Sequence, residues 1–326
     1  LTSISNSESI GGSSFSTLDI ANSIFQLARV QMGPAIYLSV HLMVSKIIEQ
    51  ADIEKKHSSI ISELIAGNKL GAFCLTEASA GSDAKAIKTT LTKNGSKYIL
   101  NGEKIYITSA GHADIYLVFA KDSSISEKNN ITACIVDKNT TGLSFGIEEE
   151  KMGCESSPIA SVIFNHCEID SSSILGKPGD GYTIALSGLI GGRINIAAAA
   201  CGVSSSAVEK AVLFSKERKQ FGSAISEFQM IQSMLANMAM KLSASINLVR
   251  DACANDSSRY HAAIAKCFAT DSAMEITTDA VQIFGGAGYL KEYTVEQLMR
   301  DAKMLQIVEG TNQIQRILIA KEMLKD

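Results

Sequence analysis

The hydrophobic periodicity of this chain changes twice, and these two changes constrain the fold more than any other feature. Apolar residues recur at helical spacing from Thr17 until Gly67 and Asn68, which form a helix stop. Between residues 71 and 176, short apolar runs are separated by glycine and asparagine, as in strands joined by turns. The pattern then becomes helical again, and no proline follows Pro178 to interrupt it. Long helices are predicted over roughly 181–217, 226–252, 259–284 and 310–325.

This order of helices, strands and helices predicts an α+β protein with three parts. We expect a partial N-terminal helical region over 1–70, a central antiparallel β domain over 71–176 and a helical bundle over 177–326. The Ser- and Gly-rich residues 1–13 are expected to be loose. In KYILNGEKIYIT (97–108), the Asn101-Gly102 dipeptide predicts a tight hairpin between two strands, because it tolerates positive φ angles. Further strands are predicted over 115–120, 131–137 and 160–169.

The composition fits a globular protein and argues against several classes of function. Of the 326 residues, 46% are hydrophobic and 20% are charged, which supports a sizeable core. The net charge of −4 and the scattered Lys and Arg residues give no electrostatic signal for nucleic acid. Seven cysteines without a CxxC pair predict free, mostly buried thiols in a reducing compartment. Five widely spaced histidines form no zinc pattern, so no metal is expected.

No membrane span is expected from the sequence. The most apolar stretch, residues 180–202, is interrupted by glycines, by Ser187 and by Arg193. The chain begins at Leu1 rather than Met, so a targeting peptide would lie outside this sequence.

Four segments could hold a polar ligand, although each also has an ordinary structural explanation. In the segment 72–84, a strand is predicted to end at Thr76, and the loop that follows it is rich in small and hydroxyl side chains. Tyr106 and Thr108 share one face of a strand and could contact a flat heteroaromatic ring. Arg218, near a helix end, could bind phosphate or lie on a solvated face. The glycines within 281–289 permit close approach of a pyrophosphate, or they simply end a helix.

Glu309 is the candidate for acid–base chemistry. It follows Ile307 and Val308 and precedes Gly310, so an ionisable carboxyl ends an apolar run. Apolar surroundings would raise its pKa and make it a useful base. The alternative is an acid that complements the dipole of the helix predicted to begin near Thr311.

Six motifs, in their order along the chain, resemble the acyl-CoA dehydrogenase family: LTEASAGSD, GEKIYIT, ERKQFG, QIFGGAGY, RDAK and VEGTNQIQR. The resemblance runs from about residue 15 to the C-terminus and favours the short- and branched-chain members, such as isobutyryl-CoA dehydrogenases. It implies FAD as cofactor, an acyl-CoA substrate, and an electron-transfer flavoprotein as electron acceptor. It also implies a homotetramer built as a dimer of dimers, a C-terminal four-helix bundle, and a location in the mitochondrial matrix or the bacterial cytoplasm.

The resemblance assigns roles residue by residue. Glu309 matches the base that removes the α-proton while the β-hydrogen leaves as hydride to the flavin, which gives a trans-2-enoyl-CoA. Gly192 stands where other members place the base, and this favours Glu309. The positions that match FAD contacts, some of them across a subunit interface, are Phe73, Leu75, Thr76, Gly81, Ser82, Tyr106, Ile107, Thr108, Arg218, Phe221, Phe228, Gln229, Gln282, Ile283, Phe284, Gly285, Gly286, Thr311, Asn312 and Gln313. The positions that match the substrate site are Ser82, Ile190, Gly191, Gly192, Arg193, Glu309 and Gly310.

The chain departs from the family pattern in three places. Ala78 replaces a usual proline, Ile190 replaces Asp or Asn, and residues 1–70 are shorter than the family's N-terminal helical domain. The last difference leaves a fragment, a clipped form and a degenerate paralogue as alternatives. An acyl-CoA oxidase and a non-catalytic scaffold are the rival functions, and the intact Glu309, Arg193 and Arg218 argue against the scaffold.

Overall fold

A computed structural model describes residues 1–126 and 130–325 of the protein. Its contacts divide the chain into two compact units. The first unit consists of residues 1–16, 37–150 and 157–192, and the second of residues 17–36, 151–156 and 193–326. These units cut across the predicted boundaries after residues 70 and 176, because two long helices contribute residues to both units.

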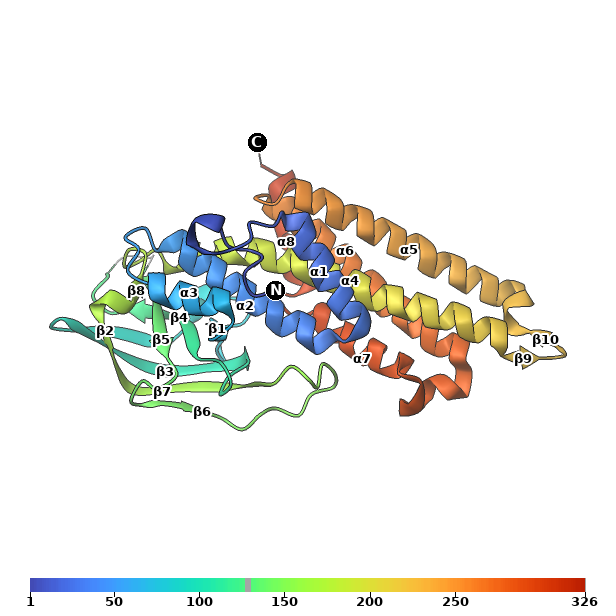
Figure 1. The fold of residues 1–326 in the computed structure, drawn as a ribbon, viewed down its shortest axis with the longest axis horizontal. Coiled ribbons are helices and arrows are strands. Elements are labelled where there is room, and N and C mark those ends of the chain that lie inside the picture. Colours follow the sequence, from blue (N-terminus) through green and yellow to red (C-terminus); the bar gives the residue numbers. More distant parts are fainter. Residues whose placement is uncertain (127–129, 326) are drawn as a thin grey trace. The chain divides into compact units, whose positions relative to one another are not determined.

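Helices precede and follow the strands along the chain, as the periodicity predicts (Figure 1). The α-helices are α1 (Thr17–Val30), α2 (Met32–Ala51), α3 (Ser58–Ala66), α4 (Gly181–Glu217), α5 (Gln229–Ala254), α6 (Arg259–Phe284), α7 (Val295–Leu305) and α8 (Asn312–Met323). The helices predicted over 181–217 and 259–284 are confirmed as α4 and α6. Helix α7 is absent from the predicted set, because its 11 residues are shorter than the long periodic segments around it.

Eight strands form one sheet in the first unit, and a short hairpin lies in the second. The strands are β1 (Gly71–Cys74), β2 (Thr90–Asn94), β3 (Lys97–Thr108), β4 (Ile115–Asp122), β5 (Ile131–Asp137), β6 (Leu143–Phe145), β7 (Ile159–Asp170), β8 (Ile174–Leu175), β9 (Lys219–Gln220) and β10 (Ser223–Ala224). The sheet order is β6-β7-β3-β2-β4-β5-β8, and β1 pairs with β4. β1 and β2 each run parallel to β4, so the sheet is mixed rather than purely antiparallel as predicted. Alternating burial indicates a strand but carries no information about its direction.

Strand β4 is buried on both faces, and it joins the two halves of the first unit's core. Leu117 and Phe119 belong to an apolar cluster with side chains from α2 and α3. Tyr116 and Val118, which point the opposite way, belong to a second cluster that includes side chains from β3 and β7. One face of β4 therefore packs against helices and the other against side chains of the same sheet (Figure 1).

The turn between β2 and β3 lies at Gly95-Ser96, because Asn94 pairs with Lys97 across it. Gly95 has φ +63, the left-handed conformation that glycine adopts at little cost. The prediction of a hairpin turn at Asn101-Gly102 is therefore wrong, because the preceding Asn-Gly pair, Asn94-Gly95, forms the turn.

The Asn101-Gly102 dipeptide lies inside the continuous strand β3. The pairing of β3 with β7 shifts register between Leu100 and Gly102, which marks a β-bulge. Gly102 has φ +144, and a Cβ added there would lie 2.7 Å from the Thr89 Cα. Both Asn-Gly pairs meet the local requirement for a turn, and pairing with the distant strand β7 decides which one forms it.

The prediction that residues 1–13 are loose is also wrong. Asn6 is fully buried; its Nδ2 donates to Glu49 Oε2 at 3.0 Å, and its Oδ1 accepts from Ser45 Oγ at 3.0 Å. The Ser7 N–H donates to the other oxygen of Glu49 at 3.1 Å. Composition alone misses this order, because polar contacts to α2 add to the burial of Ile4.

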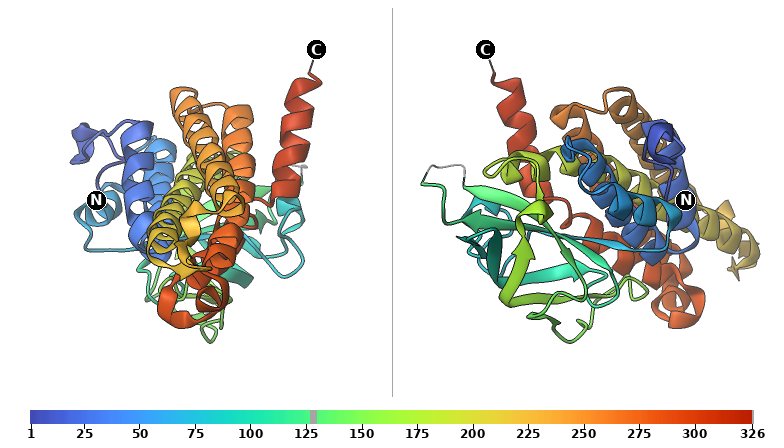
Figure 2. Two further views of the ribbon diagram at one scale, coloured as in Figure 1. Left: turned by 90° about the vertical axis from the view of Figure 1, so that its right-hand side faces the viewer. Right: turned by 60° about the vertical axis from the view of Figure 1, so that its left-hand side comes forward.

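Helix α6 is the centre of the second unit, and α5, α7 and α8 all pack on it (Figures 1 and 2). Its buried positions are mostly Ala, Ser and Thr, which allow neighbouring helices to approach closely. Near its end Phe284 stacks on Phe214 of α4, with ring centroids 4.0 Å apart. All seven cysteines are free and buried, as the spacing predicts.

By length and composition alone, one helix in the described part of the chain, α4, could cross a membrane. Within its most apolar window, however, 61% of the residues are buried inside the protein. Burial in the core therefore accounts for the apolar composition of α4.

Replacing Gly102 by Ala should destabilise the protein more than replacing Gly95 by Ala. At Gly95 the added Cβ meets no atom within 4 Å, so only the left-handed conformation costs free energy, about 1–2 kcal/mol. At Gly102 the Cβ also overlaps backbone, so about 3 kcal/mol or more should be lost. Thermal unfolding midpoints of the two variants test this, and equal shifts would contradict the close packing of Gly102 against Thr89.

Candidate functional site

The turn between α7 and α8 holds Glu309 in a strained backbone conformation. Glu309 and Gly310 are consecutive left-handed residues, with φ +57 and φ +86. A non-glycine residue in this region costs on the order of 1–3 kcal/mol, and it persists only where the surroundings impose it. At the helix start that follows, Thr311 Oγ1 accepts from the Ile314 N–H, as expected of an N-cap residue.

Donors from three helices impose this conformation through the two backbone carbonyls. The Glu309 carbonyl accepts from Arg193 Nε of α4 at 3.2 Å and from Gln315 Nε2 of α8 at 3.1 Å. The Gly310 carbonyl accepts from Gln315 Nε2 at 2.8 Å and from Lys266 Nζ of α6 at 3.0 Å. The φ of +86 favours glycine at position 310, where an added Cβ would also lie 2.9 Å from Gln315 Nε2.

The Glu309 carboxyl is poorly solvated, although the residue as a whole keeps some accessible surface. Its Oε2 is buried and has no hydrogen-bond partner. Burial raises the pKa of Glu309 to about 7, against the opposing effect of the positive charges of Arg193 and Lys266. Within the described residues, the Glu309 N–H also makes no hydrogen bond. A carboxyl that titrates near neutrality, beside a free N–H donor, is suited to accept a proton from a bound carbonyl compound.

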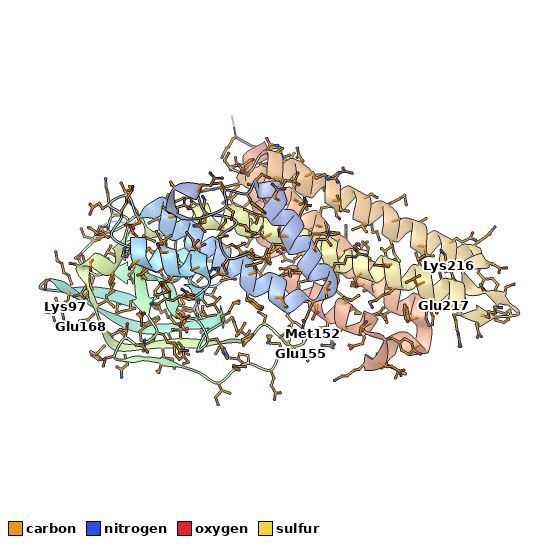
Figure 3. The ribbon with its side chains drawn as sticks, in the orientation of Figure 1. Lys97, Met152, Glu155, Glu168, Lys216 and Glu217 are labelled. Atoms are coloured by element: carbon orange, nitrogen blue, oxygen red, sulfur yellow. The ribbon has the colours of Figure 1, made fainter. Side chains whose placement is uncertain are left out.

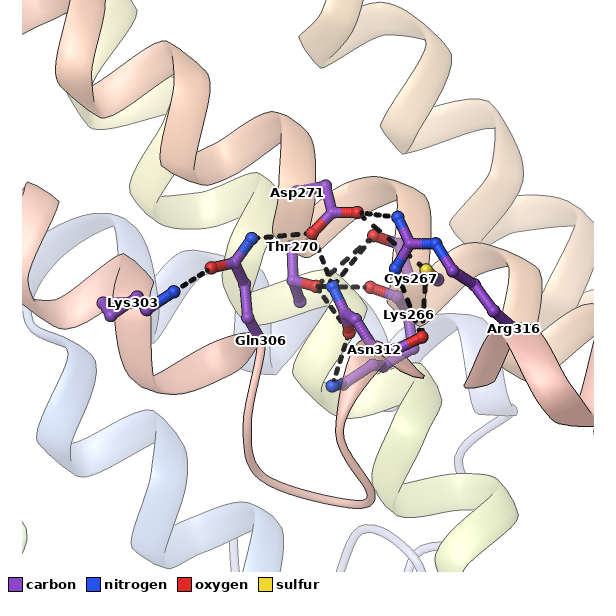
Figure 4. A network of polar contacts seen from close by, with 8 residues as sticks. All are labelled: Lys266, Cys267, Thr270, Asp271, Lys303, Gln306, Asn312 and Arg316. Atoms are coloured by element: carbon purple, nitrogen blue, oxygen red, sulfur yellow. Dashed lines mark hydrogen bonds and ion pairs between the residues drawn. The ribbon is translucent and has the colours of Figure 1, made fainter. Parts of the chain in front are cut away.

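A polar network lies behind this turn, buried at Lys266, Thr270 and Asn312 and open to solvent at Arg316 (Figure 4). Asn312 Oδ1 accepts from Lys266 Nζ at 2.8 Å, and Asn312 Nδ2 donates to Asp271 Oδ1 at 2.7 Å. Arg316 donates to Asp271 Oδ2 at 2.6 Å. The side chain of Asn312 is therefore occupied within the protein, whereas Gln313 is exposed.

A cavity of about 330 Å³ opens beside this network in the second unit. It is lined by Asp271, Lys303, Gln306, Ile307, Thr311, Asn312, Gln313 and Arg316. It thus brings the predicted cofactor contacts Thr311 and Gln313 together with two basic side chains, which suit an anionic ligand.

In the first unit, the structure brings together two segments that the sequence singles out separately. The Ile105 N–H donates to the Thr76 carbonyl at 3.0 Å, so the loop after β1 lies beside the end of β3. Tyr106 has φ +57 and is 62% exposed, and Thr108 is two residues further along the strand. Strand β1 ends at Cys74, two residues before the predicted end at Thr76.

A buried ion pair holds this loop in place. Lys104 is fully buried, and its Nζ donates to Glu77 Oε1 at 2.7 Å and to the Leu75 carbonyl at 3.1 Å. Burial alone would raise the pKa of Glu77, but hydrogen bonds from Lys104 and from the Thr89 and Lys88 N–H groups bring it below its usual value. Burial lowers the pKa of Lys104, and the hydrogen bond and negative charge of Glu77 oppose this, so each group favours the charged form of the other. The pair fixes the backbone that precedes Gly81 and Ser82.

The other predicted contact residues divide into buried and exposed groups. The side chains of Leu75, Ile107, Ile283 and Phe284 belong to the core, so only their backbone could contact a ligand. Those of Arg218, Phe221, Gln229 and Gln282 are exposed, and Phe221 is 96% exposed. An added Cβ at Gly81, Gly285 or Gly286 would meet no atom within 4 Å, so the backbone there is open to a partner.

The predicted substrate positions 190–193 follow one another on α4. Gly191 is exposed, with open space around its Cα, whereas Arg193 is 5% exposed and binds the Glu309 carbonyl. Burial lowers the pKa of Arg193, and the negative charge of Glu309 opposes this. In the described part of the chain, no group of three or more His, Cys, Asp and Glu side chains could hold a metal ion.

Sequence reasoning misses Lys266, Gln315 and Lys104. Each has a usable signal, namely a charged or amide side chain at a position that the hydrophobic period assigns to the core. Their partners cannot be read from the sequence, because Lys266 and Gly310 are 44 residues apart and Arg193 and Glu309 are 116 apart.

Known proteins resemble the chain along nearly all of its length. Residues 72–167 match the middle domain of acyl-CoA dehydrogenases, and residues 179–324 match their C-terminal domain. The mitochondrial isobutyryl-CoA dehydrogenase of Dictyostelium discoideum is 38% identical, over 98% of this chain and 78% of that protein.

Two solved structures have the same fold. The butyryl-CoA dehydrogenase of Megasphaera elsdenii has a TM-score of 0.96 and 41% identity, over 99% of this chain and 87% of that one. A chain from a structure described as "Electron transferring flavoprotein of Acidaminococcus fermentans: Towards a mechanism of flavin-based electron bifurcation" has a TM-score of 0.97 and 43% identity, over 100% and 87% of the two chains.

Replacing Lys104 by Met should strongly destabilise the protein, because Glu77 would remain buried without its cation. Breaking a buried pair in this way costs about 3–5 kcal/mol. The control is Lys97→Met, which removes the exposed pair with Glu168 (Figure 3) and should cost less than about 1 kcal/mol. Urea unfolding of both variants provides the comparison, and similar losses would argue against an ionised buried pair.

Proposed function

Because this chain belongs to the acyl-CoA dehydrogenase family, we propose that it converts a short or branched short-chain acyl-CoA to the trans-2-enoyl-CoA with Glu309 as the base. The chain is an oxidoreductase of the class that acts on CH–CH groups. The observation that carries the proposed role of Glu309 is its buried Oε2 without a hydrogen-bond partner, in a carboxyl whose pKa is raised to about 7.

The chemistry requires a proton acceptor at the α-carbon and stabilisation of charge on the thioester oxygen. The Glu309 carboxylate would take the α-proton, and its own N–H is available to donate to the thioester carbonyl. The carbonyl of Glu309 is held by Arg193 and Gln315, so the peptide group that follows the base is fixed in direction. The Arg193 and Lys266 charges favour the carboxylate form that can accept the proton.

FAD is the cofactor of this family, and the residues present fit it. In the first unit, the exposed Tyr106 and the half-buried Thr108 lie close to the Thr76 loop, and they offer an aromatic face and hydroxyls to a flat heteroaromatic ring. In the second unit, open backbone at Gly285 and Gly286 would allow a diphosphate to approach. When bound, FAD supplies the acceptor that takes the β-hydrogen with its electron pair.

We place the acyl chain in the short or branched short range. Support comes from the relatives, whose names specify isobutyryl-CoA and butyryl-CoA. An electron-transfer flavoprotein is the proposed electron acceptor, which the structure described for Acidaminococcus fermentans supports. A homotetramer in the mitochondrial matrix or the bacterial cytoplasm completes the proposal. The exposed Phe221 and Arg218, which match contacts across a subunit interface, support the oligomer.

Replacing Glu309 by Gln should leave FAD bound but abolish its reduction by acyl-CoA. The amide keeps the shape of the carboxyl and cannot accept the proton, so the rate should fall by at least about 10²–10⁴-fold. The measurement is bleaching of the flavin absorbance at about 450 nm after mixing with butyryl-CoA or isobutyryl-CoA without oxygen. Glu292→Gln, which changes an exposed carboxyl, is the control.

Bleaching of Glu309→Gln at the wild-type rate would identify another residue as the base. Protein that cannot be reconstituted with FAD at all would favour a scaffold. Oxygen consumption at the rate of substrate oxidation would favour an oxidase.

The pH dependence of kcat/KM should report the unusual carboxyl. Only the deprotonated form of Glu309 accepts a proton, so kcat/KM should rise as the pH increases through about 7. A carboxyl with an ordinary pKa would instead give a flat profile over this range. Initial rates between pH 5.5 and 9 with an artificial electron acceptor test the prediction.

Replacing Arg218 by Ala should weaken FAD binding and the oligomer together, because the matching family position contacts the cofactor across a subunit interface. Gel filtration of the reconstituted protein, followed by the flavin-to-protein absorbance ratio, measures both effects. Arg250→Ala on α5 removes another exposed arginine and should change neither. Full flavin retention and an unchanged elution volume in Arg218→Ala would contradict a contact between Arg218 and FAD.

A further inference from the structure

We infer that Lys266 is a positioning residue for the base: its ammonium group fixes the turn that carries Glu309 and places a positive charge near the carboxyl. This inference rests on the proposed role of Glu309. It concerns the side of the turn that faces the interior of the second unit, and it requires no residue of the first unit.

The contacts of Lys266 span the whole turn. Lys266 is fully buried on α6, between Ala265 and Cys267. Its Nζ donates to the Gly310 carbonyl at 3.0 Å. It also donates to Asn312 Oδ1 at 2.8 Å (Figure 4). Gly310 follows the base directly, and Asn312 is the first residue of α8. One ammonium group therefore ties the strained backbone to the start of the next helix.

Both hydrogen-bond partners of Lys266 are neutral, and this makes its charge unusual. A buried ammonium without a carboxylate partner is costly, and a neutral side chain could fill the same volume. Among the charged groups around Lys266, Glu309 opposes most strongly the effect of burial, which lowers the pKa of Lys266 to about 8. The positive charge of Lys266 is thus stabilised mainly by the negative charge of the Glu309 carboxylate, and not by a hydrogen-bonded carboxylate.

The other charged groups around the turn do not replace this role. Asp271 of α6 is held by Arg316 of α8 and by Asn312, and these contacts bring its pKa below the usual range despite burial. Cys267 of α6 is buried, which raises its pKa and keeps it neutral. Arg193 of α4 is the second cation that favours the Glu309 carboxylate, and it reaches the turn from the opposite helix.

Removing the charge of Lys266 should therefore shift the titration of the base. With Arg193 as the remaining cation, the deprotonated form of Glu309 is less favoured, so a higher pH is needed to reach it. In Lys266→Met and Lys266→Gln, the acid limb of kcat/KM should move upward by about one pH unit or more. Lys266→Arg keeps a positive charge and should leave the limb near its wild-type position. Lys216→Met, at the exposed end of α4 (Figure 3), is the matched control and should not move it.

A second measurement is independent of turnover. Amide hydrogen exchange at residues 309–312 should become faster in Lys266→Met, because the Gly310 carbonyl and the side chain of Asn312 lose their shared donor. Lys266→Gln retains an amide donor, so the position of its acid limb tests the inference if the Met variant does not fold. An acid limb that stays in place in the Gln variant, or unchanged exchange at 309–312 in a folded Met variant, would overturn the inference.

The same experiments separate this inference from the proposed function. Full activity in Glu309→Gln would contradict the proposed role of Glu309 as the base, whatever the result with the Lys266 variants. An inactive Glu309→Gln together with Lys266 variants whose acid limb does not move removes only the role of Lys266.

Discussion

The second unit depends on the capture of two adjacent backbone carbonyls by buried donors. Glu309 and Gly310 adopt left-handed conformations, and their carbonyls are bound by Arg193, Gln315 and Lys266. Without those donors, two buried acceptors and a strained residue would together cost several kcal/mol, since each unsatisfied buried polar group costs about 1–3 kcal/mol. The same donors come from α4, α6 and α8, so the turn also joins these helices.

A buried lysine has a comparable place in the first unit. Lys104 binds the Leu75 carbonyl just before the loop that matches flavin contacts, as Lys266 binds the Gly310 carbonyl just after Glu309. The two differ in their compensation, because Lys104 has the carboxylate of Glu77 within hydrogen-bond distance and Lys266 has only neutral partners. Lys104 therefore completes a structural ion pair, whereas the charge of Lys266 is available to the Glu309 carboxyl.

Several local features could be predicted because their causes are local. Helices α4 and α6 follow from uninterrupted periodicity without proline, and Thr311 is an N-cap because its hydroxyl reaches the Ile314 N–H. Glu309 is conspicuous as a carboxyl at the end of an apolar run before a glycine. The sequence does not tell which of two Asn-Gly pairs, Asn94-Gly95 or Asn101-Gly102, forms the hairpin turn. Both pairs satisfy the same φ requirement, and pairing with β7 decides between them.

The sequence by itself determined the succession of helices and strands, the family motifs and the identity of the candidate base, since periodicity and short motifs act over a few residues. Only the tertiary structure decided the mixed direction of the sheet, the anchoring of residues 1–13 and the donors that hold Glu309. Those features depend on contacts between residues far apart in the chain, such as Arg193 with Glu309 and Lys266 with Gly310. The physical reason is that a buried polar atom is satisfied by whichever donor the fold brings to it, and sequence separation places no limit on that donor.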